Sequence, residues 1–180
     1  MTFFLLPWGM PFAWGADGNQ TLYLDENGSL WATGDNDNGQ LGDGNQTDRN
    51  QSVRITLSGV VAIAVGGEHS LCLKNDGSLW AAGDNAYGQL GDGTNTDRNS
   101  SFVRVVDANV LAFAGGEKHS LFLKSDGSLW GMGYNGQGRL GDGSGGTDRT
   151  NPVKVVDANV SVSPVEQPYV AETAADVTDP

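Results

Sequence analysis

The chain has 180 residues, enough for one domain with one sizeable core. Its 27 glycines, 6 prolines and short runs of Asn and Asp are typical of all-β proteins with many tight turns. The formal net charge of -12, with no basic stripe, argues against a nucleic-acid partner, and the single cysteine, Cys72, excludes an intrachain disulfide and a cysteine-based zinc site.

The first fourteen residues are apolar and uncharged, and they are too few to span a bilayer as a helix. They are similar to the apolar part of a signal peptide, although a basic start and a clear cleavage site are missing. The other interpretation is that residues 10–13 supply the first strand of the fold. We therefore separate an N-terminal apolar segment, residues 1–11, from the rest of the chain.

Three sequence motifs recur at intervals of about fifty residues. Ser-Leu-Trp occurs three times and ends at Trp31, Trp80 and Trp130. Gly-Gln-Leu-Gly-Asp-Gly also occurs three times, the third time with Arg139 in place of Gln, and Thr-Asp-Arg follows each copy. These copies indicate three tandem repeats within residues 12–162, at about 12–59, 60–109 and 110–158, before an acidic tail or linker at residues 163–180.

In the second repeat the pattern predicts four short strands and no helix. An Asn-Asp-Gly hairpin turn separates the two middle strands, because glycine tolerates a positive φ. The expected strands are residues 60–65, 70–74, 78–82 and 102–106. Four strands in each of three repeats predict an all-β fold, a β-propeller segment of three four-stranded blades that forms a partial or open ring.

Several recurring residues are expected to build the scaffold. The tryptophans should act as wedges between adjacent blades. The loop after each third strand is long and contains one large apolar residue, which we expect to be buried beneath the loop as an anchor. The histidines, or Gln20 in the first repeat, should tie neighbouring backbone segments together. These structural residues are Trp31, Trp80, Trp130, His69, His119, Leu41, Leu90 and Leu140.

The pattern Gly-Gly-x-His-Ser-Leu-x-Leu-x-x-Asp-Gly-x-Leu-Trp-x-x-Gly-x-Asn-x-x-Gly-Gln-Leu-Gly, which residues 66–91 follow, resembles the repeat of the regulator of chromosome condensation family. Residues 115–141 also carry it, and residues 18–42 carry it with Gln20 in place of His. The resemblance implies a propeller, commonly of about seven blades. It implies functions as different as nucleotide exchange on a small GTPase, chromatin binding by the nuclear founding member, and β-lactamase inhibition by a secreted bacterial relative.

The chain departs from the nuclear exchange factor in having three repeats, no inserted segment that could pry a GTPase open and no basic tail for DNA. These departures favour a non-catalytic protein–protein interaction scaffold, which is not an enzyme. A guanine-nucleotide exchange factor for a small GTPase is the alternative, and a carbohydrate- or calcium-binding surface module is another. The sequence of the repeats resembles that of bacterial proteins. The sequence does not determine the cellular compartment, and a secreted or surface location is preferred to the cytoplasm.

No residue pattern indicates catalysis or a cofactor. His69 and His119 occupy equivalent positions in different blades, so they should not form a catalytic or metal-binding pair. Cys72 aligns with aromatic residues of the other repeats, which indicates an apolar filler. Residues 35–39 are similar to a calcium loop, but the glycine comes one place early and the twelfth residue is Gln46, which has no carboxylate.

Positions that differ between repeats are the candidate partner-binding residues, because recurring positions are explained by the scaffold. Neutral drift in solvent is the alternative explanation for them. Tyr87 is the preferred candidate, since exposed tyrosine is enriched in protein interfaces. The full set of candidates is Asp37, Asn38, Ala86, Tyr87, Gly136 and Gln137.

Each blade of a propeller covers a face of the next, so three blades leave two faces without a neighbour. The chain can be a piece of a larger propeller, its terminal segments can cap the faces, or a second copy can complete the ring. The last option fits the length, because 180 residues are about 3.6 repeat periods. We therefore expect a protein partner of unknown identity, a homodimer or further blades, no nucleic acid and no membrane span.

Overall fold

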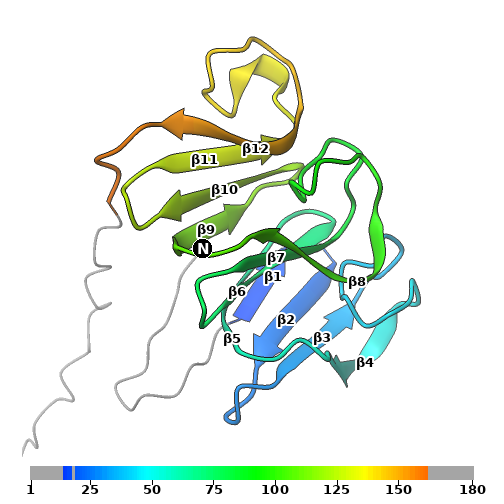
Figure 1. Ribbon diagram of the computed structural model, residues 1–180. Coiled ribbons are helices and arrows are strands. Elements are labelled where there is room, and N and C mark those ends of the chain that lie inside the picture. Colours follow the sequence, from blue (N-terminus) through cyan, green and yellow to red (C-terminus); the bar gives the residue numbers. More distant parts are fainter. Residues whose placement is uncertain (1–13, 18, 162–180) are drawn as a thin grey trace, which may run out of the picture.

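The computed structural model describes residues 14–17 and 19–161 and forms three four-stranded sheets (Figure 1). The expectations for residues 1–13 and 162–180 lie outside the described residues. The first sheet contains β1 (Trp14–Asp17), β2 (Gln20–Leu24), β3 (Leu30–Gly34) and β4 (Arg49–Arg54). The second contains β5 (Val60–Val65), β6 (His69–Lys74), β7 (Leu79–Gly83) and β8 (Arg98–Val106). The third contains β9 (Val110–Gly115), β10 (His119–Lys124), β11 (Leu129–Gly133) and β12 (Arg149–Val156), with a short 3-10 turn, η1 (Gly136–Gly138).

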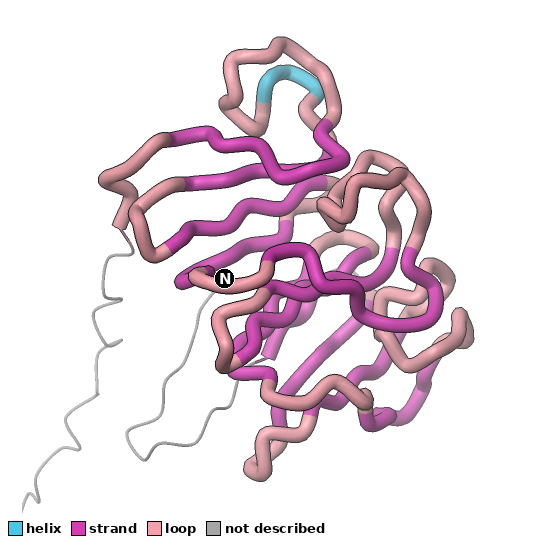
Figure 2. The backbone as a smooth tube through the Cα atoms, viewed as in Figure 1, coloured by secondary structure: helices cyan, strands magenta, loops and turns pink. Residues whose placement is uncertain are grey.

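Each sheet is an antiparallel meander in which every strand pairs with the next one along the chain. The prediction of three four-stranded blades in an open, all-β arrangement is confirmed. β8 exceeds its expected length most, because it begins at Arg98, which pairs with Gly83 before a register shift leads to the Ala81–Val103 pair. In each sheet the long loop between the third and fourth strands lies at the same end as the turn between the first two strands, and the hairpin turn between the second and third strands lies at the other end (Figure 2). The two ends of the scaffold therefore differ in chemistry.

Side chains alternate along each strand, so every sheet has two different faces. We call one the leucine face, since it carries three leucines from the middle strands, namely Leu22, Leu24 and Leu30, or Leu71, Leu73 and Leu79, or Leu121, Leu123 and Leu129. We call the other the aromatic face, since it carries a tryptophan from the third strand and its cross-strand partner, namely Tyr23 and Trp31, or Cys72 and Trp80, or Phe122 and Trp130.

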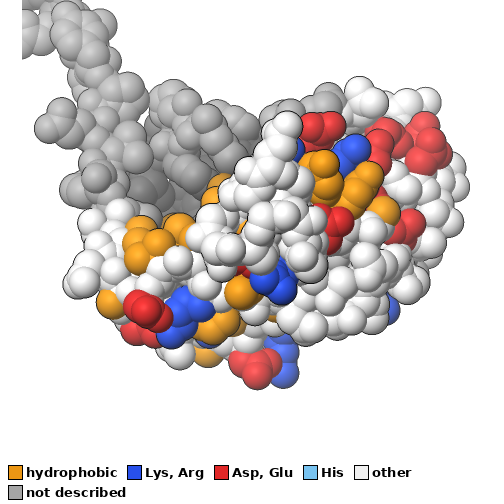
Figure 3. Space-filling model, turned by 90° about the horizontal axis from the view of Figure 1, so that it is seen from above, with side chains coloured by type: hydrophobic (Ala, Val, Ile, Leu, Met, Phe, Trp, Pro, Cys, Tyr) orange, Lys and Arg blue, Asp and Glu red, His pale blue; other side chains and the backbone are white. Residues whose placement is uncertain are grey.

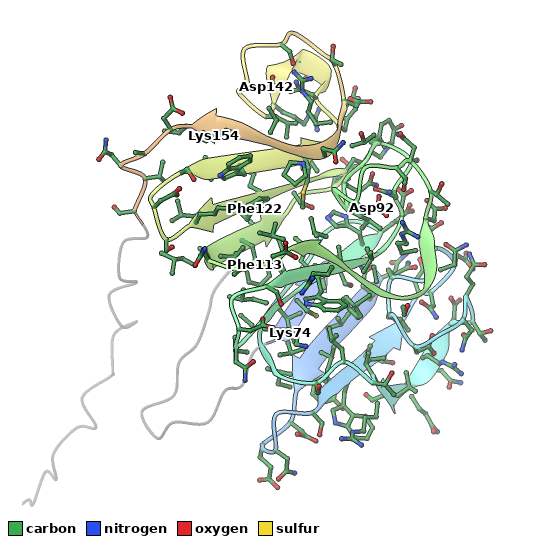
Figure 4. All side chains as sticks on the ribbon, in the orientation of Figure 1. Lys74, Asp92, Phe113, Phe122, Asp142 and Lys154 are labelled. Atoms are coloured by element: carbon green, nitrogen blue, oxygen red, sulfur yellow. The ribbon has the colours of Figure 1, made fainter. Side chains whose placement is uncertain are left out.

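The sheets stack with a leucine face against an aromatic face. One core cluster joins Leu22 and Leu30 of the first sheet to Ile63 and Cys72 of the second, with Trp80 at its margin. A second cluster joins Leu71, Leu73 and Leu79 to Phe113, Phe122 and Met132 of the third sheet, with Trp130 at its margin; Figure 4 labels Phe113 and Phe122 on that sheet. The same pairing of faces therefore holds both neighbouring pairs of sheets together.

The tryptophans are half-buried, and short hairpin turns hold their indole N–H groups. In the third sheet the Trp130 indole donates to the Ser128 hydroxyl at 2.8 Å, and Ser128 donates to Asp126. Trp80 uses Ser78 in the same way at 2.9 Å. In the first sheet the indole of Trp31 donates directly to Asp25, also at 2.9 Å. Trp31, unlike the other two tryptophans, belongs to neither core cluster, and no sheet of the described residues covers the aromatic face on which it lies.

A buried asparagine organises the long loop of each repeat. Asn85 is 0 % exposed, its Nδ2 donates to the Thr94 carbonyl at 2.9 Å and to Asp92 at 3.1 Å, and its Oδ1 accepts from the Leu90 N–H at 3.0 Å. Asn36 and Asn135 make the equivalent bonds in the other two loops. These loops contain no strands whose backbone groups could pair with one another. The buried asparagine side chain instead makes the hydrogen bonds that hold the loop in one conformation.

An arginine–aspartate pair closes each loop. Arg98 donates to Asp92 at 2.6 Å, and Arg49–Asp43 and Arg149–Asp142 are the equivalent pairs; Figure 4 labels Asp92 and Asp142 inside their loops. Burial raises the pKa of Asp92, but hydrogen bonds from Thr94 and the nearby Arg98 outweigh it and hold the pKa below its usual value. The large apolar residues beneath the loops, Leu41, Leu90 and Leu140, are 0, 0 and 2 % exposed.

Two equivalent glycines in these loops have different surroundings, which gives a matched test of the stacking. Gly88 and Gly138 both have a positive φ, +82° and +70°. A Cβ on Gly88 would lie 2.5 Å from Thr150 Cα in the third sheet, whereas a Cβ on Gly138 would meet nothing within 4 Å. The loop of the second repeat therefore touches the next sheet's backbone directly.

We expect Gly88→Ala to lower the free energy of unfolding by about 3 kcal/mol, from backbone strain together with the clash. Gly138→Ala should cost only the strain, about 1 kcal/mol. Urea unfolding of the two variants measures both costs. Equal losses would show that the loop of the second repeat does not pack on the third sheet as described.

Candidate protein-binding surface

Two tyrosines and two basic side chains meet where the loops of the second and third repeats adjoin. The rings of Tyr87 and Tyr134 contact edge to face, with centroids 5.0 Å apart and planes at 63°. The Lys118 ammonium lies 5.3 Å from the Tyr87 ring centroid, and the Arg139 guanidinium lies 4.5 Å from that of Tyr134. We call these four residues the tyrosine patch.

The patch combines accessible aromatic surface with positive charge. Arg139 is exposed, while Tyr87, Lys118 and Tyr134 are half-buried. The rings are held by one another and by the cations, so little side-chain freedom remains for a partner to remove. On the face seen in Figure 3, apolar side chains form separate areas next to Lys and Arg, with Asp and Glu around them. The patch carries two positive charges in a chain whose net charge is -12.

A coordinated departure from the repeat builds one half of the patch. In the second repeat Gln89 Nε2 donates to Asp84 at 2.7 Å, and its Oε1 accepts from the Tyr87 N–H at 2.9 Å. The third repeat has Tyr134 at the Asp84 position and Arg139 at the Gln89 position. A cation–π contact thus replaces an amide–carboxylate hydrogen bond, and an aromatic ring becomes available beside Tyr87.

The other half of the patch, Tyr87 and Lys118, spans the boundary between the second and third sheets, and it also differs from the equivalent residues of the preceding repeat. Between the first two repeats, Asn38 Nδ2 donates to Glu68 at 3.2 Å. Tyr87 and Lys118 occupy the equivalent positions between the second and third repeats. One boundary therefore presents an amide and a carboxylate, and the other presents an aromatic ring and an ammonium group.

The structure separates the sequence-based candidates from one another. Asp37, Ala86 and Gln137 are exposed, and Asn38, Tyr87 and Gly136 are partly buried. Only Tyr87 lies in the tyrosine patch, and its three neighbours there were not nominated. The signal for them was present, because Lys118, Tyr134 and Arg139 all differ from the residues at equivalent places in the second repeat.

The histidine position links neighbouring sheets. The ring Nε2 of the fully buried His69 lies 2.9 Å from the Ser120 hydroxyl, which donates to the Gln89 carbonyl at 2.8 Å. His69 therefore reaches the backbone of its own repeat through a side chain of the next sheet. In the first repeat Gln20 Nε2 donates directly to the Gly66 carbonyl at 3.1 Å. His119, at the same position in the third sheet, is half-buried.

Burial controls the protonation of these inner groups. It lowers the pKa of His69 to about 4, and the neighbouring His119 contributes a smaller repulsion. Burial also lowers the pKa of His119, with a further contribution from Arg139. The thiol of Cys72 is fully buried, and burial raises its pKa, so the nucleophilic thiolate is disfavoured. These groups are neutral at pH 7, in keeping with roles in packing.

Three carboxylates in the first loop lie close together. One oxygen each of Asp35, Asp37 and Asp48 falls within 4.8 Å of the others. Two of these groups already accept backbone hydrogen bonds of the same loop, Asp35 from the Asp37 N–H and Asp48 from the Asn36 N–H. Ala86 and Gly136 replace Asp37 in the other repeats, so the cluster belongs to the first loop alone.

Family models identify the repeat. A model of the regulator of chromosome condensation (RCC1) repeat matches residues 27–73 and 76–123. A second model of the same repeat matches residues 60–89 and 110–139. No curated protein matches the chain. Across residues 14–17 and 19–161, no helix is long and apolar enough to cross a membrane.

Solved structures share the fold. Human WBSCR16 is 26 % identical, with a TM-score of 0.66 over 76 % of this chain and 37 % of that one. Prp20p from Saccharomyces cerevisiae, studied with its binding to Gsp1p and histones, is 24 % identical, with a TM-score of 0.68 over 81 % and 39 %. A chain from the structure of Kap60 bound to yeast RCC1 (Prp20) is 25 % identical, with a TM-score of 0.68 over 86 % and 38 %. This chain thus spans less than two fifths of the length of each.

Proposed function

This chain belongs to the regulator of chromosome condensation (RCC1) repeat family, and from that premise we propose that it is a non-catalytic scaffold that binds a protein partner through the tyrosine patch. The observation that carries the proposal is the convergence of four departures from the repeat, Tyr87, Lys118, Tyr134 and Arg139, on one surface. The needs of the scaffold explain residues that recur at the same position in every repeat. Binding of a partner explains residues that differ between repeats and lie together on one surface.

The chemistry of the patch suits a protein partner. Tyrosine and arginine are enriched among the residues that dominate binding energy in protein interfaces. Two rings in edge contact offer apolar area, and Lys118 and Arg139 offer positive charge to a carboxylate at the margin of that area. The similar yeast protein Prp20p is described with its binding to Gsp1p and histones, and Kap60 is described bound to it. Protein partners for such propellers support the same class of partner here.

Guanine-nucleotide exchange is the alternative function. Exchange needs a segment that enters a GTPase and displaces its nucleotide, and the long loops of the described residues are instead tied down by Asn36, Asn85 and Asn135. A nucleotide-release assay with small GTPases decides between the two functions. We expect release of labelled GDP at the intrinsic rate, and faster release would overturn the non-catalytic proposal.

A photo-crosslinking amino acid at position 87 tests the binding surface in cells that make the protein. We expect a crosslinked protein partner from position 87 and none from position 38, the equivalent place in the first repeat. With that partner purified, Tyr87→Ala should weaken binding by about tenfold or more, as removal of an interface tyrosine does. Asn38→Ala should leave the affinity unchanged. Equal affinity of wild type and Tyr87→Ala would remove the patch from the interface.

A further inference from the structure

The stack of three sheets ends in two unlike faces. The leucine face of the first sheet packs on the second sheet, and the leucine face of the second packs on the third. Among the described residues, no sheet covers the leucine face of the third sheet or the aromatic face of the first (Figure 1). These two faces are the two halves of an interface that the molecule builds twice internally.

The leucine face of the third sheet keeps the composition of an interior. Leu123 is 5 % exposed, but Leu121 and Leu129 are partly exposed, whereas Leu71 and Leu79, the equivalents of these two in the second sheet, are 0 % exposed. An apolar hollow on this sheet is lined by residues of β9, β10 and β11 together with Val160. No polar residue has replaced these leucines, so the face is suited to packing against another sheet and not to exposure to water.

The aromatic face of the first sheet matches the surface that covers such leucines elsewhere in the molecule. Tyr23 and Trp31 stack with ring centroids 6.5 Å apart and planes at 9°. Phe122 and Trp130, which pack against the second sheet's leucines, stack at 6.2 Å and 5°. The aromatic pair of the first sheet therefore has the shape that the internal interface uses.

The polar positions also correspond. In the internal interface His69 bonds the Ser120 hydroxyl of the next sheet. The third sheet has His119 at the His69 position, and the first sheet has a hydroxyl, Thr21, at the Ser120 position. A donor–acceptor pair for a third interface of the same kind is thus present in the chain, with one partner on each uncovered face.

We propose that the uncovered faces pair between two copies of this chain, with the leucine face of one copy's third sheet on the aromatic face of the other copy's first sheet. In this contact the His119 ring forms a hydrogen bond with the Thr21 hydroxyl of the second copy, as the His69 ring does with the Ser120 hydroxyl within one chain. The contact is head to tail, so it closes into a ring of six blades if the rotation between sheets permits, and otherwise continues into longer stacks.

Light scattering on the full chain tests the proposal with one variant for each face. Leu121→Arg places a charge on the leucine face, and Thr21→Arg places one on the aromatic face; both positions are partly exposed in a single copy. We expect wild type to assemble and each variant alone to be monomeric. An equal mixture of the two variants should form a one-to-one dimer, since it has one intact pair of faces and two blocked ends.

Ser125→Arg is the matched control, because Ser125 is exposed in a hairpin turn of the third sheet and lies on neither face. It should assemble as wild type does. Since each substitution makes an acidic chain less negative, added repulsion between copies cannot explain dissociation. Circular dichroism and thermal melting show whether the variants fold, and an unfolded variant is replaced by Leu129→Lys or Tyr23→Lys on the same face.

A wild-type chain that stays monomeric overturns the proposal and leaves the faces to further blades or another protein. Assembly that survives both variants, or a mixture that yields no dimer, overturns it as well. The outcome is independent of the proposed function, because the tyrosine patch lies at the boundary of the second and third sheets and none of these variants alters it.

Discussion

Asn85→Ala is expected to lower the free energy of unfolding by about 3 kcal/mol, among the largest effects of any loop substitution. The Asn85 side chain is fully buried and supplies a donor to Asp92 and the Thr94 carbonyl and an acceptor to the Leu90 N–H. Alanine would leave the Thr94 carbonyl and the Leu90 N–H without these partners in an enclosed site, whereas Asp92 keeps its bonds from Thr94 and Arg98. Each unsatisfied polar group costs about 1–3 kcal/mol. Denaturant unfolding monitored by tryptophan fluorescence gives the change.

Asn95→Ala is the control in the same loop. Asn95 is exposed and makes one side-chain hydrogen bond, to the Ala86 carbonyl at 2.9 Å. Its replacement should change stability by about 0.5 kcal/mol or less, as surface substitutions usually do. Similar losses for Asn85→Ala and Asn95→Ala would mean that the loop is not organised around its buried asparagine.

The second large effect is a loss of stability on acidification that depends on His69. Burial lowers the pKa of this histidine from 6.5 to about 4. Between these values the unfolded chain binds a proton that the folded chain excludes, so stability must fall as the pH falls from about 6.5 towards 4. At about 1.4 kcal/mol for each pKa unit, the loss is about 3 kcal/mol, and the contribution is fully present above pH 6.5.

His69→Gln isolates this contribution. Glutamine is the natural occupant of the position in the first repeat, where Gln20 donates to the Gly66 carbonyl, so the variant should fold. We expect the free energy of unfolding of wild type to fall more steeply than that of His69→Gln between about pH 7 and pH 4, measured by denaturant unfolding. Parallel curves would contradict the buried, neutral imidazole.

Carboxylates do not disturb the comparison. Hydrogen bonds from Ser78 and Ser128 are the chief causes of the lowered pKa values of Asp76 and Asp126. A carboxylate with a lowered pKa contributes stability above its unfolded pKa of 3.8, and that stability disappears as the pH falls further. The contribution is common to wild type and His69→Gln, so it cancels in the difference between them.

Local sequence determined the strands, the turns and the division into three sheets. Side chains alternate with a period of two along a strand, so residues that share a face, such as Leu71 and Leu73, can be assigned without knowledge of the rest of the fold. Hairpin turns such as Asn75-Asp76-Gly77 depend on backbone angles that glycine permits locally. Recurrence at a fixed interval then extended one repeat's assignment to the other two.

Only the tertiary structure decided which surfaces meet. Lys118 is separated from Tyr87 by two strands, β8 and β9, and their contact exists because the loop of the second repeat packs against the third sheet. The role of Asn85 likewise depends on groups up to eleven residues away that converge on one buried side chain. Alternation and turn chemistry act between near neighbours, so they can be derived from sequence, as can the presence of two faces without a neighbour. The tyrosine patch and the pairing of leucine faces with aromatic faces follow from packing between distant segments, which no local pattern encodes.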